Sequence, residues 1–352
     1  MLISVLAVVV TFGLVICLHE LGHFILCRIL KIRVETFAIG FGPAIWRKEH
    51  NGTLYVLRAI PLGGYVKPAG ETLDEHKGAP DEYFSHPWYE RICLHLAGPA
   101  MNYILAFLLF TGVIIGAGTP APSDDPVIGE IVEGDPAYQA GMREGDKITS
   151  INGTATASWK AVADIIHANP DQATKISYER GGDKFNIALT PKKYDGIGLI
   201  GISPGITYKS VGIVKSVWLG GYQCWYWTKY TLVTLGSKIY HREKPDLAGP
   251  VGIVHMISKA AHSGFSNLVY FIGLISVAVG IFNLLPIPIL DGGQSLIFLW
   301  EGISRRKPTM RMFQTANAIG FAFLICVLVF VTYNDVARIF TKPAAATTDV
   351  KK

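Results

Sequence analysis

Charged residues are scarce in this chain: Asp, Glu, Lys and Arg make up 17% of its 352 residues, whereas 50% are hydrophobic. Such a composition is too apolar for an ordinary soluble enzyme, yet not apolar enough for a protein made of membrane helices throughout. We therefore expect a few membrane spans joined to a polar domain. The net charge of +5 is small, and basic residues lie beside apolar runs, which excludes an extended nucleic-acid-binding face.

Paired cysteines are also missing. The chain has five cysteines and no Cys-x-x-Cys, and most of them lie in apolar stretches (Cys17, Cys27, Cys93 and Cys326). This pattern argues against a disulfide framework and against thiolate-bound zinc. The first apolar run lacks the basic start of a signal peptide, so we expect it to be retained.

Four segments are long enough and free enough of charge to span a bilayer, at about 2–26, 92–115, 268–290 and 316–331. A fifth stretch, 211–235, is apolar but contains Lys215 and Lys229 together with many tryptophans and tyrosines. Aromatic residues combined with lysines are typical of an amphipathic helix that lies on the membrane surface. We therefore predict four transmembrane helices and one interfacial helix.

The first apolar run leads directly into the sequence His19-Glu20-Leu21-Gly22-His23. Two histidines four residues apart lie on one face of a helix, so both imidazoles can reach one divalent metal, usually zinc. The adjacent glutamate can then act on a metal-bound water. The alternative is a pair of helix-end histidines that reach towards the membrane interface.

Asp291 is the best candidate for the third ligand that such a metal needs. It ends the third apolar run, where a carboxylate is costly unless it is paired or ligating, and Pro286 and Pro288 precede it. Prolines there interrupt the helix, and irregular backbone inside a membrane is tolerated where it lines a cavity. The alternative for Asp291 is an interfacial carboxylate at a helix end.

Lysines and arginines predict the orientation. They are concentrated at 28–91 and 305–311, which places both loops in the cytoplasm and the block between the second and third spans outside. If 211–235 does not cross the membrane, the third span starts outside, as the first does. Asp291 then reaches the depth of the histidines, near the cytoplasmic side.

The block at about 126–191 resembles a PDZ domain. It contains Asp135-Pro136-Ala137, Ala140-Gly141-Met142, Gly145-Asp146-Lys147-Ile148 and Ile151-Asn152-Gly153 in that order. We expect strands at 127–132, 147–151, 175–180 and 185–190 and a helix at 159–168. PDZ domains capture peptide segments by adding them to a sheet edge. The alternative is a small β domain of another kind.

Over nearly its whole length the chain resembles the bacterial site-2 proteases, the RseP-type intramembrane zinc metalloproteases. The resemblance rests on the following segments: His19 to His23, Phe41-Gly42-Pro43, Arg58 to Lys67, Ala97-Gly98-Pro99-Ala100-Met101-Asn102, Gly249-Pro250-Val251-Gly252-Ile253 and Asn283 to Gly293. The enterobacterial members carry two tandem PDZ domains, whereas this chain has room for one.

The resemblance implies Zn²⁺ bound by His19, His23 and Asp291, with Glu20 as the general base. It also implies a membrane-associated β-hairpin at 54–67 that turns at Leu62-Gly63-Gly64 and holds the substrate extended. Asn283 and Pro288 match positions thought to contact substrate. Without the resemblance, Gly63 and Gly64 could form an ordinary turn, and Asn283 and Pro288 could only cap and kink the third span.

The resemblance further implies regulated intramembrane proteolysis of single-span membrane proteins, such as pre-cleaved anti-sigma factors or remnant signal peptides, in the bacterial inner membrane. The expected fold is a mainly α membrane protein with four transmembrane helices, the hairpin and one extracytoplasmic PDZ domain. We expect the divisions 1–122 (first two spans and hairpin), 123–195 (PDZ), 196–262 (interfacial region), 263–342 (last two spans) and 343–352 (tail).

Two other functional classes remain open on the residues alone. A membrane metal transporter or sensor would use the same ligands with the PDZ block as an adaptor, but it would not need Glu20. A non-catalytic scaffold acting through the PDZ domain would leave the buried His, Glu and Asp unexplained. Of the other polar residues in apolar runs, we expect His95 and Asn102 to hydrogen-bond between helices rather than bind metal.

Overall fold

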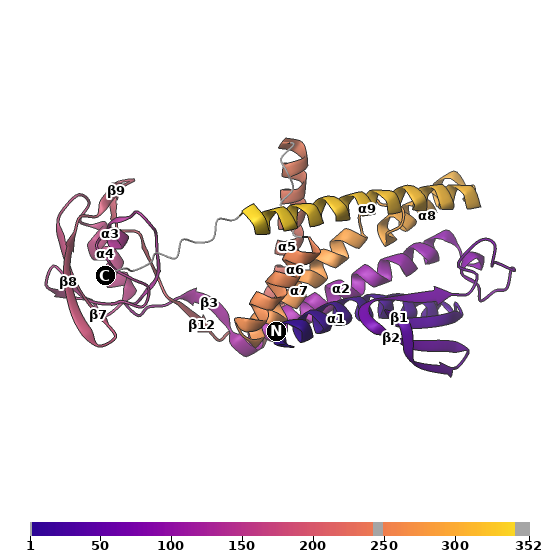
Figure 1. Ribbon diagram of the computed structural model, residues 1–352, viewed down its shortest axis with the longest axis horizontal. Helices are drawn as coiled ribbons and strands as arrows, with labels where there is room; N and C mark the ends of the chain where they lie inside the picture. The colour runs from indigo at the N-terminus through magenta and orange to yellow at the C-terminus, as the bar shows by residue number, and fades with distance from the viewer. Residues whose placement is uncertain (1, 242–248, 342–352) are drawn as a thin grey trace. The chain divides into compact units, whose positions relative to one another are not determined.

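A computed structural model describes residues 2–241 and 249–341 (Figure 1). The chain forms two compact units, which we call unit 1 (residues up to 114 and from 213) and unit 2 (Ile115–Gly212). Unit 2 is larger than the division 123–195 expected from the sequence, because it also takes in 115–122 and 196–212. The expected tail, 343–352, lies outside the described residues.

Unit 1 is built mainly of helices, and it also contains the short 3-10 helix Tyr83–Ser85. Its described α-helices are α1 (Leu2–Leu30), α2 (Trp88–Ala117), α5 (Ile213–His241), α6 (Pro250–His262), α7 (Phe265–Asn283), α8 (Asp291–Ser304) and α9 (Met310–Thr341). Among the described residues, four helical stretches are long and apolar enough to cross a membrane, namely α1, α2, α7 and Met310–Asp335 of α9. At most 33% of the most apolar window of each is buried inside the protein, so most of these apolar side chains face outwards, as lipid contact requires.

Helices α1, α2 and α7 pack closely because small residues lie where they meet. Val15, Leu105 and Ile272 form one buried apolar cluster, and Gly273 of α7 lies against the ring of Phe110. Gly22 of α1 lies so close to the backbone carbonyl of Ala97 that any side chain would collide with it. Small residues permit this kind of close approach in membrane helix bundles.

The third apolar run is interrupted as the prolines predict. α7 ends at Asn283 and α8 begins at Asp291, so residues 284–290 are not helical. Gly292 and Gly293 lie against the carbonyls of Leu284 and Ile287, where a Cβ would clash. Gln294 donates hydrogen bonds both to the Pro288 carbonyl and, over 2.8 Å, to Asn317 Oδ1 of α9, which fixes the irregular segment between two helices.

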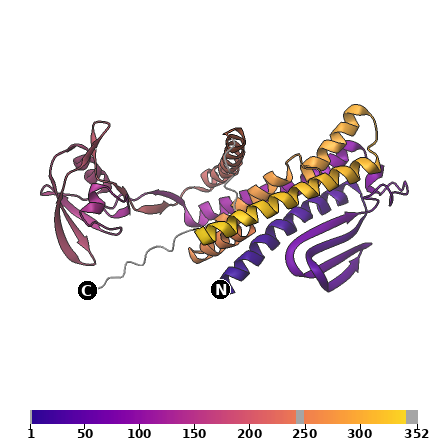
Figure 2. The ribbon, with the colours of Figure 1, turned by 45° about the horizontal axis from the view of Figure 1, so that its top comes forward.

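The strands of unit 1 differ from the hairpin that the sequence predicted at 54–67. β1 (Val34–His50) and β2 (Thr53–Pro68) join at Asn51-Gly52, where both φ angles are positive. Ala38 lies opposite both Val56 and Tyr65, so the first half of β1 separates the two halves of β2. Leu62-Gly63-Gly64 is therefore part of a bend within β2, not the turn of a two-stranded hairpin. Figures 1 and 2 show β1 and β2 lying against α1.

The segment predicted to be interfacial forms α5, on which Trp218, Tyr222, Tyr226 and Tyr230 follow one another at helical spacing as ring neighbours. These four rings are substantially exposed. The location of α5 on the membrane surface stays a prediction.

Asp335 of α9 accepts hydrogen bonds from the backbone amides of Gly249 (3.1 Å) and Gly252 (2.8 Å) at the start of α6. A carboxylate is favourable at a helix N-terminus, so this contact ties α9 to α6.

Unit 2 is a β-rich domain with its own apolar core. Its elements are β3 (Thr119–Pro122), β4 (Ile128–Ile131), α3 (Pro136–Gln139), β5 (Lys147–Ile151), β6 (Thr154–Ala155), α4 (Trp159–His167), β7 (Thr174–Arg180), β8 (Asp183–Leu189), β9 (Lys192–Tyr194), β10 (Ile197–Leu199), β11 (Ile202–Pro204) and β12 (Ile206–Lys209). The main sheet has the order β6-β5-β7-β8, and Val162 and Ile166 of α4 belong to the buried core. The four predicted strands and the predicted helix are present within a few residues. β3, β6 and β9–β12 were not predicted.

Candidate metal centre

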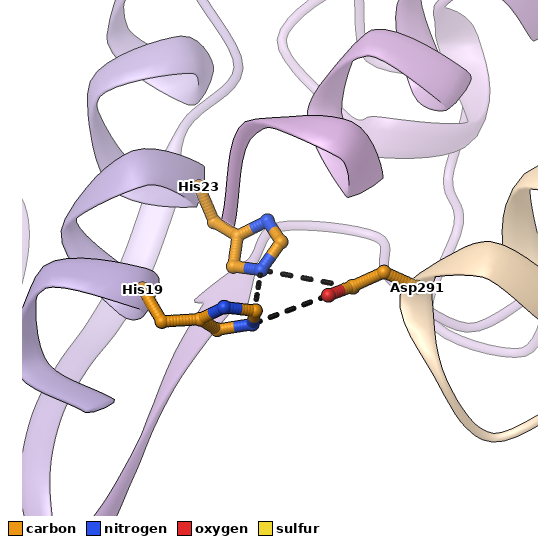
Figure 3. A group of neighbouring side chains, drawn as sticks. All are labelled: His19, His23 and Asp291. Atoms are coloured by element: carbon orange, nitrogen blue, oxygen red, sulfur yellow. Dashed lines mark hydrogen bonds and ion pairs between the residues drawn. The ribbon is translucent and has the colours of Figure 1, made fainter. Parts of the chain in front are cut away.

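His19, His23 and Asp291 converge at one point in unit 1, with one potential ligand atom of each within 4.8 Å of the others (Figure 3). The two histidines come from one face of α1, as their spacing predicts, and Asp291 comes from the first turn of α8. His19 Nε2 lies 3.2 Å from His23 Nε2 and 3.2 Å from Asp291 Oδ2. His23 Nε2 lies 3.6 Å from Asp291 Oδ1.

These separations fit the ligand set of a tetrahedral zinc. Zn–N and Zn–O bonds of about 2.0–2.1 Å place the ligands of a tetrahedral ion about 3.3–3.4 Å apart. Three ligand atoms and one remaining position correspond to the arrangement of catalytic zinc sites. Two imidazole nitrogens and a carboxylate facing one another would hold a divalent cation, which relieves the cost of burying them.

Both histidines are oriented by a partner at Nδ1, and this leaves Nε2 for the metal. His23 Nδ1 lies 2.8 Å from the Leu94 carbonyl, which can only accept a hydrogen bond, so Nδ1 carries the proton. His19 Nδ1 lies 3.1 Å from the amide nitrogen of Asn102, and the Asn102 Oδ1 has no partner. Rotating that amide by 180° lets Oδ1 accept a hydrogen bond from Nδ1–H, because the two amide ends are interchangeable in shape. Asn102 therefore bonds between helices, as expected from the sequence.

Helix α2 passes close to the Nε2 atoms of the two histidines. A Cβ on Gly98 would collide with the rings of both His19 and His23. Pro99 follows inside the same helix and has no backbone N–H, so one carbonyl of the preceding turn lacks its helical hydrogen bond. Gly98 belongs to a segment that carries the family resemblance, but the sequence did not predict that this position requires a glycine to make room for His19 and His23.

Glu20 lies beside the metal ligands and against β2. Both Glu20 and the three ligands line a cavity of about 630 Å³ within unit 1. A Cβ on Gly64 would lie 3.0 Å from Glu20 Cγ and 2.9 Å from the Ala38 carbonyl oxygen. The backbone amide of Val66 interacts with the Glu20 carboxylate. β2 therefore approaches Glu20 closely, and Gly64 is one residue that allows this.

Of the other residues expected to bind substrate, some line the cavity and some do not. Asn283 lines the cavity, as do Gln294 and Asn317, which the sequence did not single out. Gly63 has a φ of +120° and lies against the Phe41 ring. Pro288 does not line the cavity, but its carbonyl accepts the hydrogen bond from Gln294. His95 of α2 hydrogen-bonds to another helix, as expected from the sequence, and its partner is Asp291 of α8, which the sequence did not identify.

The family model described as Peptidase family M50 matches residues 7–327. The chain belongs to peptidase family M50. Zinc metalloprotease RasP of Geobacillus kaustophilus (strain HTA426) is 31% identical, covering 96% of this chain and 98% of the relative. Regulator of sigma-W protease RasP of Bacillus subtilis (strain 168) is also 31% identical, with coverage of 96% and 99%.

Among solved structures, the PDZ domain of an SdrC-like protein from Listeria monocytogenes matches part of this M50 peptidase. The two share 25% sequence identity with a TM-score of 0.22, over 24% of this chain and 90% of the Listeria chain.

Proposed function

We propose that His19, His23 and Asp291 hold the Zn²⁺ of this M50 peptidase and that Glu20 is its general base. The chain is a zinc metalloprotease of the site-2 type, which carries out regulated intramembrane proteolysis. The observation that supports the residue assignment best is the convergence of two imidazoles and one carboxylate at tetrahedral spacing beside Glu20. A metal transporter or sensor, the alternative that the residues left open, is not favoured, because the family and the relatives are peptidases.

Each residue has a defined task in this mechanism. When bound, zinc supplies a Lewis acid that makes water more acidic and polarises a peptide carbonyl. Glu20 takes the proton of the attacking water and delivers it to the leaving amine nitrogen. Asn102 and the Leu94 carbonyl keep His19 and His23 in the tautomer that presents Nε2.

A peptide bond within a helix is shielded, so the substrate must be extended before hydrolysis. The edge of β2 near Gly63 and Gly64 lies next to Glu20, and an extended segment could pair with such an edge. Asn283 faces the same cavity and could hold the substrate backbone through its amide. We propose Pro288 as a contact only through its segment, since Pro288 itself does not line the cavity.

We propose single-span membrane proteins as substrates, such as anti-sigma factors that another protease has already cut, or remnant signal peptides. A relative named regulator of sigma-W protease supports the first of these. A protein with four helices that could span a membrane suits a multi-pass location in the bacterial inner membrane. We place unit 2 outside and the metal centre near the cytoplasmic side, on the basis of the lysine and arginine distribution.

The orientation can be tested by single cysteines at Ser158 of unit 2 and Ser304 of α8, introduced into a chain without its native cysteines. A membrane-impermeant maleimide should label the Ser158 position in intact cells and the Ser304 position only after lysis. Labelling of Ser304→Cys from outside would contradict the proposed topology.

We propose that unit 2 is a PDZ domain that receives peptide segments. A cavity of about 460 Å³ lies between α4 and the segment 199–203, lined by side chains that include Trp159, Ile166 and Ile202. β11 pairs with β4 on one side, which suits strand addition along the other. Loss of peptide binding in Ile166→Asp, with unit 2 still folded, would support this proposal.

Glu20→Gln provides the decisive test of the mechanism. The variant should retain about one zinc per chain, because Glu20 is not a ligand, while cleavage of a model single-span substrate falls by about 10²–10⁴-fold or more. A variant that loses both zinc and activity would make Glu20 a ligand. Cleavage at the normal rate would refute its role as the base.

A further inference from the structure

His95 of α2 lies between the proposed ligand Asp291 and the buried Tyr83. Its Nδ1 is 3.3 Å from Asp291 Oδ1, and its Nε2 is 2.9 Å from the Tyr83 hydroxyl. Tyr83 is 4% exposed, so its hydroxyl needs a partner within the protein. Neither the M50 assignment nor the proposed mechanism gives these two residues a task.

The direction of both hydrogen bonds follows from the chemistry of the groups. An ionised carboxylate can only accept, so His95 Nδ1–H must donate to Asp291. In the neutral ring Nε2 then carries a lone pair and accepts from the Tyr83 O–H. The chain Tyr83 to His95 to Asp291 therefore runs in one direction, and the tyrosine selects the tautomer that the aspartate requires.

The His95 ring is also held in place by packing. It stacks on Phe298 of α8 with ring centroids 5.8 Å apart and an interplanar angle of 16°. Arg91 covers Phe298 at 4.4 Å and pairs with Glu301 over 2.7 Å, with both charged side chains almost buried. α2 and α8 are thus tied together beside the ring, so the imidazole has little freedom to turn away from Asp291.

We propose that His95 is a positioning residue that orients the Asp291 carboxylate towards the metal, with Tyr83 fixing the tautomer of His95. This inference rests on the proposed ligand set. A carboxylate on a single flexible bond samples several orientations, and a donor at Oδ1 restricts it to one. Removing such an outer partner of a metal ligand typically costs about 10- to 100-fold in metal affinity.

The test measures zinc affinity of the detergent-solubilised full chain by competition with a chromophoric chelator. His95→Leu should bind zinc about 10- to 100-fold more weakly than the wild type. His95→Asn should recover most of this loss, because its amide N–H lies near the position of Nδ1–H. Tyr83→Phe, which keeps the ring and removes only the hydroxyl, should weaken zinc binding less than His95→Leu does. Tyr89→Phe on the exposed side of α2 is the matched control and should leave the affinity unchanged.

Several outcomes would overturn the proposal. If His95→Asn bound zinc no better than His95→Leu, ring packing and not the hydrogen bond would support Asp291. If the visible spectrum of the Co²⁺-substituted His95→Leu reported one fewer ligand, His95 would be a ligand. Wild-type affinity in His95→Leu would remove its role altogether. Wild-type affinity in Asp291→Ala would instead refute the ligand set, which separates the two failures.

Discussion

The buried Asp146 of unit 2 and the partly buried Asp291 of unit 1 have different partners. In unit 2, Asp146 is fully buried, with Arg180 Nε at 2.7 Å, Arg180 Nη2 at 2.8 Å and the Arg143 backbone amide at 2.8 Å. Both of its oxygens therefore face donors. In unit 1, Asp291 faces two imidazole nitrogens that already use their protons elsewhere. Asp146 therefore has donors at both oxygens, whereas Asp291, whose Oδ1 also accepts a hydrogen bond from His95, still faces two nitrogens without protons and requires a cation.

Burial of a polar group therefore does not by itself indicate function. A satisfied carboxylate such as Asp146 supports the fold of its own unit, and breaking a buried pair leaves an uncompensated charge. A cluster of groups that all present lone pairs to one point is costly in the empty state. Such a cluster is therefore better explained by a ligand than by stability.

The largest expected effect comes from removing one ligand of the metal centre. His23→Ala or Asp291→Ala should abolish stoichiometric zinc and proteolysis, because two protein ligands do not hold a catalytic zinc tightly. Elemental analysis after gel filtration measures the zinc per chain. Asp146→Ala is the comparison and should keep about one zinc. If Asp291→Ala kept its zinc as well, the two carboxylates would not differ in the way proposed.

A comparably large effect is expected from adding one methyl group next to the Nε2 atoms of the two histidines. In Gly98→Ala the new Cβ would collide with both imidazole rings, so the ligands must move and zinc binding should be lost. Gly112→Ala on the same helix is the matched control, since nothing lies within 4 Å of its Cβ position. The control should be neutral or more stable by about 0.5–1 kcal/mol. Equal zinc content in both variants would show that α2 can move away.

The spacing of His19 and His23 was enough to predict that they share a helix face, and the prolines before Asp291 were enough to predict a break. Both inferences depend on local periodicity and local chemistry. A hydrogen bond from His95 to another helix was predicted, but neither its partner Asp291 nor the role of Gly98 was, because both depend on how closely α2 approaches α1 and α8. Such a distance between helices is not encoded in either segment alone.

The strands of unit 1 show the same limit. The resemblance to the site-2 proteases implied a hairpin at 54–67 that turns at Leu62-Gly63-Gly64. In the structure the first half of β1 lies between the halves of β2, a pairing that depends on residues 15 or more positions away. The position of Gly64 favours a glycine, because a side chain there would press against Glu20 and the Ala38 carbonyl. In unit 2, the strands β3 and β12 are too short to show an alternating pattern.

A smaller effect, confined to unit 2, is expected from Asp146→Asn. This change removes the charge that pairs with Arg180 and should destabilise unit 2 by about 1–3 kcal/mol, since Arg180 is partly exposed. The urea dependence of proteolysis within 115–212 measures the change, and Asp164→Asn on the exposed face of α4 is the control. Zinc content should be unaffected. Loss of zinc in Asp146→Asn would contradict the assignment of Asp146 to the stability of unit 2 alone.

The smallest expected effect concerns Glu82, a buried carboxylate of unit 1 that accepts hydrogen bonds from nearby donors, as Asp146 does in unit 2. Burial raises the pKa of Glu82, yet hydrogen bonds from the backbone amides of Lys77, Gly78 and Ala79, together with nearby His76, bring the pKa below its ordinary value overall. A depressed pKa in the folded state means that the ionised carboxylate stabilises the loop above the unfolded pKa of about 4.3. That contribution is lost as the pH falls through the folded pKa.

Amide hydrogen exchange measures this directly at the three donors. The protection factors at Lys77, Gly78 and Ala79, corrected for intrinsic rates, should fall between pH 7 and pH 3 in the wild type. In Glu82→Gln they should already be low at pH 7 and change little with acid, because the neutral amide is a weaker acceptor. If the protection factors had the same pH dependence in both proteins, a group other than Glu82 would be responsible for it, and the proposed role of the Glu82 carboxylate would be wrong.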